Sequence, residues 1–202
     1  MKENLSSEIF SPEQESKPKF NITTRTVVLT QDNYILLLEK SADSKNPGAL
    51  EHPGGNIDDI NILSHQNKNY LLTQEAKREI IEETSIPLNT QHNFQPIINP
   101  KNNSHNNYFE YTYSYKGQHR KTGVYCYVTR LPINHNELIE QIKINTQISN
   151  IGEAEDKHQS FELFSIEDYH KLFTNHDHNN KNFLANNSKI DPESIIKSLE
   201  RN

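Results

Sequence analysis

The chain has 202 residues, of which 32% are hydrophobic, and a formal net charge of −6. This length predicts one domain of about 150 residues with polar tails. The negative charge, with no basic stripe to offset it, argues against a nucleic-acid backbone as the main partner. No stretch approaches the ~18 apolar residues of a membrane span, and no basic stretch followed by an apolar core opens the chain. We therefore expect a protein without a membrane partner, either cytoplasmic or exported by a route that needs no N-terminal signal.

Three parts are predicted along the chain. Residues 1–20 are polar, contain two prolines and are expected to form a flexible N-terminal arm. Residues 21–174 form the folded domain. Residues 175–202 form a polar linker and a C-terminal helix, which begins at the N-cap Asp191 and either docks on the domain or serves a partner.

The first predicted elements form a β-hairpin. Thr23–Thr30 is rich in β-branched residues, a polar turn follows, and Tyr34–Lys40 is a second apolar run. Gly54-Gly55 follows within residues 49–58, where two glycines permit positive φ and a close approach of the backbone to phosphate. A glycine pair alone is more often a simple turn, so only its place before the next helix gives it functional weight.

Residues 72–84 are predicted to form a helix that buries Leu72, Ala76 and Ile80 on one face. Ile81 lies well round the cylinder from these three residues, which suits a helix held between two layers.

The same helix carries an acidic stripe. The run 78–83 (REIIEE) places one arginine and three glutamates within an arc of roughly 140°. Because neighbouring carboxylates on a helix repel each other, the stripe suggests a missing cation. Oxygen-only ligands suit Mg²⁺ or Mn²⁺. A solvated helix face is the alternative, since Glu and Arg are good helix formers.

Beyond the helix, Tyr108–Tyr115 and Thr122–Leu131 flank a turn and predict a second hairpin. Cys126 lies between two tyrosines in this hairpin and is interpreted as a buried structural thiol. Within residues 161–169, Ser165 is a predicted N-cap of a helix, with Asp168 three residues on as a weaker capping box. The pattern of strands and helices indicates an α/β fold.

Gly55 and the run Arg78–Ile86 (REIIEETSI) together resemble the signature of the Nudix hydrolases. That signature is a Gly, five residues, a Glu, seven residues, and then Arg-Glu-aliphatic-any-Glu-Glu-any-Gly-aliphatic. The chain departs from it in three places: Tyr70 stands at the upstream Glu, Ser85 stands at the last Gly, and about nine extra residues precede the helix. The insertion, at 57–69, is expected at the mouth of the phosphate site, either as a lid or specificity loop or as a neutral elaboration.

The resemblance implies a Nudix-like α/β/α sandwich with a mixed β-sheet over residues 21–174. It also implies an enzyme, a Nudix-type pyrophosphohydrolase that uses Mg²⁺ or Mn²⁺ to cleave the diphosphate linkage of a small nucleoside diphosphate derivative. Family members are often homodimers. The implied metal ligands are Glu79, Glu82, Glu83 and, from the acidic loop 152–156, Glu153. The implied catalytic residues are Arg78, Glu82, Glu83 and Glu155, and the implied substrate-binding residues are Gly54 and Gly55. Position alone gives no preference between Glu153 and Glu155.

The substrate and the activity leave alternatives open. In this family a proline about fifteen residues beyond the signature resembles the ADP-ribose-cleaving members, and a tyrosine slightly further on resembles those that act on dinucleoside polyphosphates. Pro100 stands near the first position and residues 102–104 (NNS) occupy the second, which favours ADP-ribose-like substrates, although such a proline is ordinarily a turn residue. A catalytically weakened Nudix fold that binds a nucleotide or a protein is one rival function, motivated by Tyr70 and Ser85. An interaction protein that uses its terminal helix is another.

Overall fold

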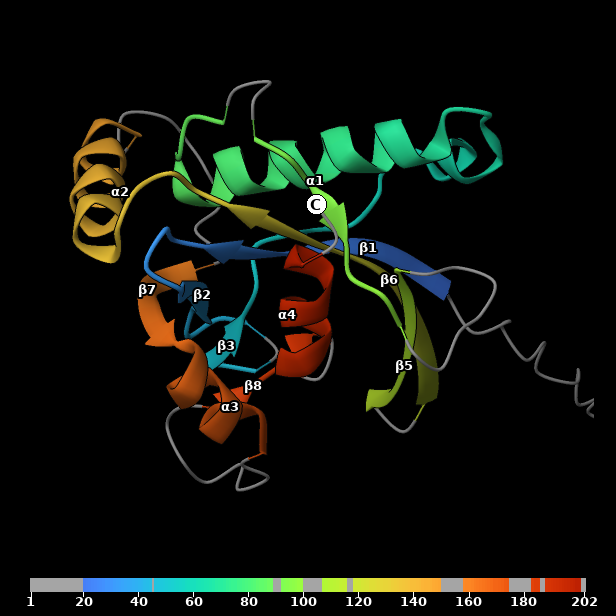
Figure 1. Ribbon diagram of the computed structural model, residues 1–202. Helices are drawn as coiled ribbons and strands as arrows, with labels where there is room; N and C mark the ends of the chain where they lie inside the picture. The colour runs from blue at the N-terminus through green and yellow to red at the C-terminus, as the bar shows by residue number, and fades with distance from the viewer. Residues whose placement is uncertain are drawn as a thin grey trace, which may run out of the picture.

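The computed structural model describes residues 20–44, 46–88, 92–99, 107–115, 118–149, 158–174, 183–185 and 188–200. The strands are β1 (Phe20–Leu29), β2 (Tyr34–Lys40), β3 (Ala49–Glu51), β4 (Gln95–Pro96), β5 (Tyr108–Tyr115), β6 (Gln118–Arg130), β7 (His158–Ser165) and β8 (Phe183–Leu184). The helices are the 3-10 helix η1 (Ile60–Ser64), α1 (Lys68–Thr84), α2 (His135–Ser149), α3 (Ile166–Thr174) and α4 (Pro192–Leu199). The strands form a mixed sheet between helices (Figure 1).

The long strands β1 and β6 form the centre of this sheet. They run parallel from the pair Phe20–Lys121 to the pair Leu29–Arg130. The order of strands is β4-β6-β1-β2-β3-β8, with β5 paired to β6 and β7 paired to β2. The predicted β1–β2 hairpin is present, but its antiparallel pairing covers only the last residues of β1. Residues 22–29 of β1 and the following Thr30 are all buried, as expected of a central strand that is covered on both faces.

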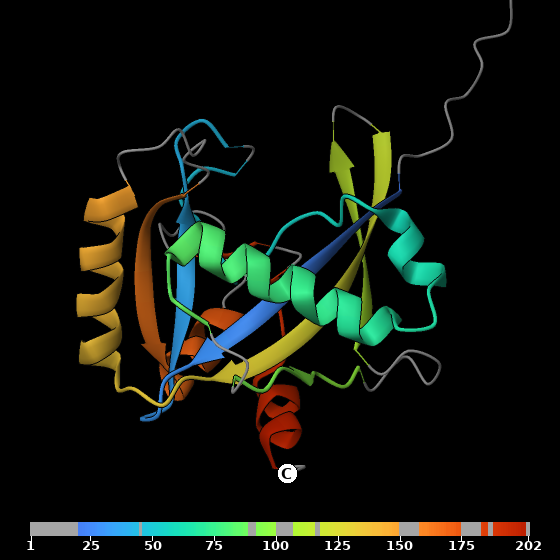
Figure 2. The same ribbon diagram turned by 90° about the horizontal axis from the view of Figure 1, so that it is seen from above.

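Helices cover both faces of the sheet, as Figures 1 and 2 show. Helices α1 and α2 pack on one face, where Leu72, Ala76 and Ile80 are buried together with Leu138 of α2. Helices α3 and α4 pack on the other face with Tyr169, Leu172 and Ile195. The predicted α/β/α arrangement is confirmed. The expectation that α1 lies between two layers is wrong, because Ile81 on its outer side is 42% exposed.

Helix α1 is longer than predicted. It begins at Lys68, four residues earlier than the apolar pattern indicates. The last two residues of the predicted insertion at 57–69 therefore belong to the first turn of α1. It ends at Thr84, and the C-cap Ser85 adopts the left-handed conformation with a φ of 55°. Glycine is the usual residue in that conformation. The signature's glycine position is therefore structurally the same here, although a serine fills it.

The C-terminal segment packs on the domain, beyond the predicted limit at residue 174. Strand β8 pairs with β3, and the Tyr169 hydroxyl donates a hydrogen bond to the Ile190 carbonyl at 2.9 Å. Asp191 caps α4 by accepting from the Glu193 amide at 3.3 Å, as predicted. Ile195 is 1% exposed. Of the two options left open for the terminal helix, the contacts show docking.

Helix α2 was not predicted from the sequence. Its start is a capping box in which Asn134 and Glu137 exchange backbone-to-side-chain hydrogen bonds at 2.9 and 3.0 Å. Leu138 and Ile142, four residues apart, are buried against the sheet. These two features were present in the sequence and are the signals that identify the helix.

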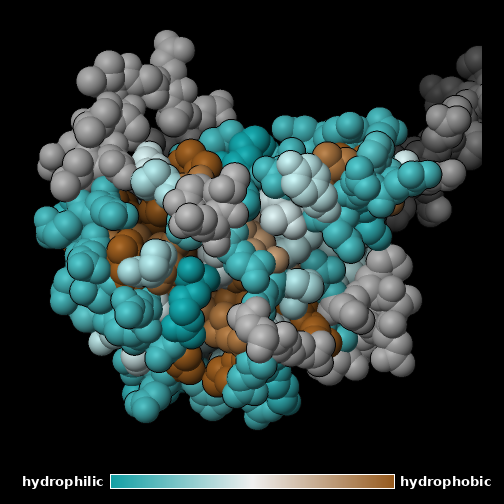
Figure 3. Space-filling model, turned by 45° about the horizontal axis from the view of Figure 1, so that its top comes forward, coloured by the Kyte–Doolittle hydropathy of each residue, from teal (hydrophilic) through white to brown (hydrophobic). Residues whose placement is uncertain are grey.

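Among the described residues, no helix is long and apolar enough to cross a membrane. Cys126 is buried, and this burial raises the pKa of its thiol, as expected of a structural cysteine. On the face seen in Figure 3, hydrophobic side chains gather in several separate areas among hydrophilic ones. A homodimer stays a prediction.

Candidate active site

The Pro53-Gly54-Gly55 turn lies against β1. The amides of Thr26 and Thr24 donate to the carbonyls of Pro53 and Gly55, both at 2.9 Å. Gly54 has a φ of 148°, and a side chain there would collide with the Thr24 carbonyl oxygen. Only glycine meets both conditions without strain. The local backbone therefore requires the first glycine of the predicted phosphate turn.

The second glycine brings the turn into contact with α1. A side chain at Gly55 would collide with the carboxylate of Glu79, which is 8% exposed overall. The Gly54 amide donates to the Glu83 carboxylate at 2.8 Å. The structure thus places the acidic face of α1 directly against the glycine turn. The metal-binding and substrate-binding roles of these residues stay predictions.

Arg78 neutralises much of the acidic stripe. Its guanidinium reaches Glu75 at 2.9 Å, Glu79 at 2.5 Å and Glu82 at 2.7 Å. Burial alone would lower the pKa of Arg78, but hydrogen bonds to Glu82 and Glu75 raise it above its usual value. The inference of uncompensated repulsion along the stripe was therefore wrong, because a resident cation already lies among these carboxylates.

Glu75 orients the guanidinium of Arg78 from within the same helix. Tyr70, which stands at the position of the signature's upstream Glu, is 65% exposed. In the structure Glu75 accepts from both Nε and Nη2 of Arg78, at 3.1 and 2.9 Å. Arg78 is thus oriented by a glutamate from within α1.

Glu83 and Glu82 occupy different environments. The Glu82 side chain is 55% exposed and pairs with Arg78. The Glu83 side chain is 12% exposed, with one oxygen 3.7 Å from His158. Burial raises the pKa of Glu83 to about 7, against the lowering effect of the His158 and Arg25 charges. The two adjacent carboxylates thus differ in exposure and in the charges that they contact.

A buried charge cluster next to the turn was missed by the sequence analysis. Glu51, at the end of β3, accepts from Arg25 at 3.0 Å, from Lys40 at 2.7 Å and from His158 at 2.9 Å. Burial alone would raise the pKa of Glu51, but the Arg25 charge and the other partners hold it well below its usual range. Arg25 also donates to the Gly54 carbonyl. The sequence signal for this cluster is a charged residue within a strand, such as Arg25 or Glu51. Charged residues are rarely buried without a partner, so each of them indicates an oppositely charged residue nearby.

The donor chemistry of the acidic face fits a hard divalent cation. Glu79, Glu82 and Glu83 supply only oxygen atoms, and the carboxylates of Glu79 and Glu83 lie against the glycine turn. Among the described residues, however, no three acidic, histidine or cysteine side chains are gathered in a metal-holding group. Glu79 and Glu82 instead share Arg78. Glu153, Glu155 and Pro100 lie outside the described residues.

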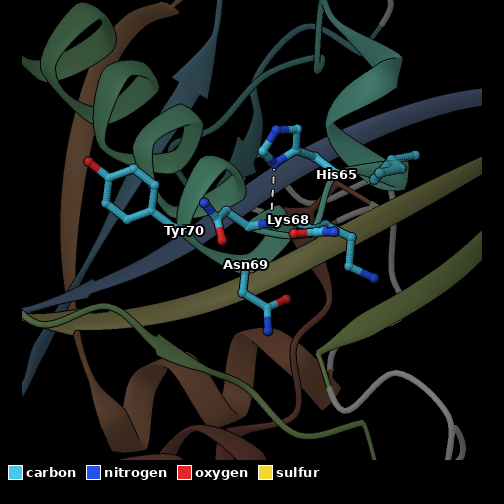
Figure 4. Close-up of a pocket in the computed structure, with 7 residues that line it drawn as sticks. His65, Lys68, Asn69 and Tyr70 are labelled. Carbon is cyan, nitrogen blue, oxygen red and sulfur yellow. Dashed lines mark hydrogen bonds between the residues drawn. The ribbon is translucent and has the colours of Figure 1, made fainter.

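A hollow of about 420 Å³ lies at the opposite end of α1 (Figure 4). Its lining includes His65, Lys68 and Tyr70, and the His65 ring accepts from the Asn67 amide at 3.1 Å. Lys68 precedes Glu79 by eleven residues, which corresponds to ~16 Å along the helix axis. The last part of the insertion therefore lies beside the start of α1, whereas its first residue, Ile57, closely follows the glycine turn, and its amide donates to the Ile22 carbonyl at 2.9 Å. A lid or specificity role for the insertion stays a prediction.

Several solved structures match this chain. The MutT protein from Methanosarcina mazei Go1 is 13% identical, with 92% of this chain and 96% of that chain covered and a TM-score of 0.52. The E. coli dihydroneopterin triphosphate pyrophosphohydrolase is 14% identical, with 79% and 89% covered and a TM-score of 0.47. A MutT Nudix hydrolase from Burkholderia pseudomallei is 16% identical, with 74% and 85% covered and a TM-score of 0.44. No protein-family model matches the sequence, and no curated protein matches it significantly.

The match to the MutT protein shows the fold of this chain. It has the Nudix-type α/β/α sandwich with a mixed sheet, over nearly the whole length of both proteins. The resemblance inferred from the glycine turn and the acidic helix is thereby confirmed at the level of the fold. At this level of identity the chemistry depends on the residues of this chain.

Proposed function

We propose that this protein is a pyrophosphohydrolase that cleaves the diphosphate linkage of a small nucleoside diphosphate derivative with the help of Mg²⁺ or Mn²⁺. The observation that carries the proposal is the contact between the glycine turn and the acidic face of α1, where Glu83 accepts from the Gly54 amide at 2.8 Å. Carboxylates that can hold a divalent cation are what such a reaction needs, and the glycine turn packs directly against the helix that offers them.

Glu79, Glu82 and Glu83 would hold the metal ion, together with Glu153 if the acidic loop approaches. When bound, the ion neutralises phosphate oxygens and lowers the pKa of a coordinated water. Arg78, which Glu75 holds from the same helix, keeps the exposed Glu82 in one orientation.

The glycine turn and the buried Glu83 also have roles in the proposed site. Gly54 holds Glu83 through its amide, and Gly55 leaves the space beside Glu79 free of a side chain. Burial raises the pKa of Glu83 to about 7, so this carboxylate is a candidate for proton transfer only where no cation is bound to it. Glu155 stays the other candidate for proton transfer. Within this proposal, the preference for ADP-ribose-like substrates is based on Pro100.

A catalytically weakened binding protein is the second candidate. The observation that favours it is Arg78, whose guanidinium reaches Glu75, Glu79 and Glu82 at 2.5 to 2.9 Å and so takes the place of a cation. Such a protein would bind a nucleoside diphosphate derivative without cleaving it, and ligand would raise its melting temperature.

Product analysis with a panel of substrates separates the two functions. The purified full chain is incubated with Mg²⁺ or Mn²⁺ and with ADP-ribose, diadenosine polyphosphates, nucleoside triphosphates and sugar nucleotides. Glu82→Gln serves as the inactive variant, and Glu193→Gln, on the exposed face of α4, serves as the matched control. Turnover that Glu82→Gln abolishes and the control retains supports the hydrolase. Thermal stabilisation by a ligand with no turnover above Glu82→Gln supports the binding protein.

A further inference from the structure

Five residues from four elements and one turn form a closed ring of contacts, which we call the Gly54 ring. Arg25 pairs with Glu51 at 3.0 Å, and Glu51 accepts from His158 at 2.9 Å. His158 lies 3.7 Å from Glu83, and Glu83 accepts from the Gly54 amide at 2.8 Å. The Gly54 carbonyl accepts from Arg25 and closes the ring.

The ring holds both backbone polar groups of Gly54. The Gly54 amide donates to the Glu83 carboxylate, and the Gly54 carbonyl accepts from the Arg25 guanidinium. The four side chains are only 3 to 12% exposed. Buried charged groups are costly unless they are paired. The pairing around the ring therefore depends on each member, and the loss of one leaves its neighbours unsatisfied.

An irregularity in the sheet directs His158 to this place. Glu39 pairs with Ser160, whereas the next residue, Lys40, pairs with His158, so the register shifts by one residue at this point. Bulges of this kind redirect side chains and often occur next to active sites. In a regular ladder Gln159 would stand opposite Lys40. The shift brings His158 to the Glu51–Glu83 gap.

We propose that the Gly54 ring is a positioning device for the site, in which His158, through Glu83 and Glu51, fixes the orientation of the Gly54 peptide groups. This proposal rests on the proposed hydrolase function. Groups that orient the residues of a metal or phosphate site usually contribute 10- to 100-fold to activity, and a fall of about that size is expected here.

The test uses His158→Ala and His158→Gln in the full chain, with His135→Ala as the matched control. His135 also pairs with a carboxylate, that of Asp32, but it lies at the start of α2. Two quantities are measured: hydrogen exchange of the Gly54 amide in ¹⁵N-labelled protein, and kcat and KM for the best substrate.

We expect His158→Ala to speed exchange of the Gly54 amide by roughly 10-fold or more and to lower kcat with little change in KM. His158→Gln, which keeps one donor, should restore part of both. His135→Ala should alter neither. Combined with Arg25→Lys, His158→Ala should lower kcat by less than the product of the two separate effects, because both act on the same peptide groups.

The outcomes separate this proposal from the function on which it rests. Unchanged Gly54 exchange in His158→Ala, beside normal turnover by the wild type, overturns the ring alone. Multiplicative effects of the Arg25 and His158 variants also overturn it. A wild-type protein that hydrolyses none of the substrates refutes the proposed function, and with it the catalytic role of the ring, whatever the exchange rates are.

Discussion

The Glu75 carboxylate accepts hydrogen bonds from two nitrogens of Arg78, Nε at 3.1 Å and Nη2 at 2.9 Å. This fork fixes the plane of the guanidinium, so that its outer nitrogens reach Glu79 and Glu82. One glutamate thus sets the position of the arginine that organises the acidic face of α1.

Replacement of Glu75 by Gln should therefore weaken the site without removing a proposed metal ligand. We expect kcat/KM to fall about 10-fold, because Arg78 loses its charged anchor and no longer holds Glu82 in one orientation. Gln74→Ala, an exposed change at the neighbouring position of α1, is the control for general effects on the helix. Equal kcat/KM values for the two variants would show that Glu75 does not orient the site.

Ser85→Gly should stabilise the protein. Ser85 adopts a φ of 55°, a conformation that costs an L-residue about 1 kcal/mol relative to glycine. For a chain of this size the melting temperature should rise by roughly 2–4 °C. Ser85→Ala, which keeps a Cβ atom, should bring no such gain. A rise of equal size for alanine would mean that the hydroxyl, and not the backbone conformation, destabilises Ser85.

Glu51→Gln should be strongly destabilising at neutral pH. The change leaves Arg25 buried without its charged partner, which typically costs about 3–5 kcal/mol of unfolding free energy. Because the folded protein holds the pKa of Glu51 well below the ordinary 4.5, its contribution is complete above that value and declines as pH falls below it.

Urea titrations at several pH values check this prediction. The difference in unfolding free energy between wild type and Glu51→Gln should be largest at neutral pH and should shrink below about pH 4.5. A difference that stays constant down to the acid limit would contradict the assigned ionisation of Glu51. Glu193→Gln, at an exposed ion pair on α4, should have little effect at any pH.

Two adjacent isoleucines of α4 test whether the C-terminal segment belongs to the core. Ile195 is 1% exposed and Ile196 is 39% exposed. We expect Ile195→Ala to lower the unfolding free energy by about 2–5 kcal/mol and Ile196→Ala to lower it much less. Similar values for both variants, measured by urea unfolding, would show that α4 does not pack stably on the sheet.

The elements that depend on local patterns were predictable from the sequence. The spacing of Leu72, Ala76 and Ile80 predicts the buried face of α1, and Ser165 predicts the start of α3, where its hydroxyl accepts from the Asp168 amide at 3.1 Å. The parallel pairing of β1 with β6 was not predictable, because it joins segments about one hundred residues apart that carry no matching local signal.

The same distinction holds for the candidate site. The acidic face of α1 and the glycine turn each carry a local sequence pattern within about thirty residues, although the spacing between them departs from the signature, and the structure brings them together. The Gly54 ring joins residues that are 26 and 107 positions apart in the chain, as the Arg25–Glu51 and Glu51–His158 pairs show. Only the folded sheet places them next to each other. The carboxylates of α1 do not repel each other without compensation, as the sequence suggested. Arg78 pairs with Glu75, three residues before it, and with Glu82, four residues after it.

The central claim is that the carboxylates of α1 support metal-dependent hydrolysis. It is tested most directly by the turnover of the best substrate as Mg²⁺ is titrated, in the wild type and in Glu83→Gln, with a chelator as the zero point. We expect saturable activation in the wild type and a loss of at least 100-fold in Glu83→Gln, as for removal of a residue that acts on the reacting groups. Turnover of Glu83→Gln equal to that of the wild type, or no activation by Mg²⁺ or Mn²⁺, would contradict the account.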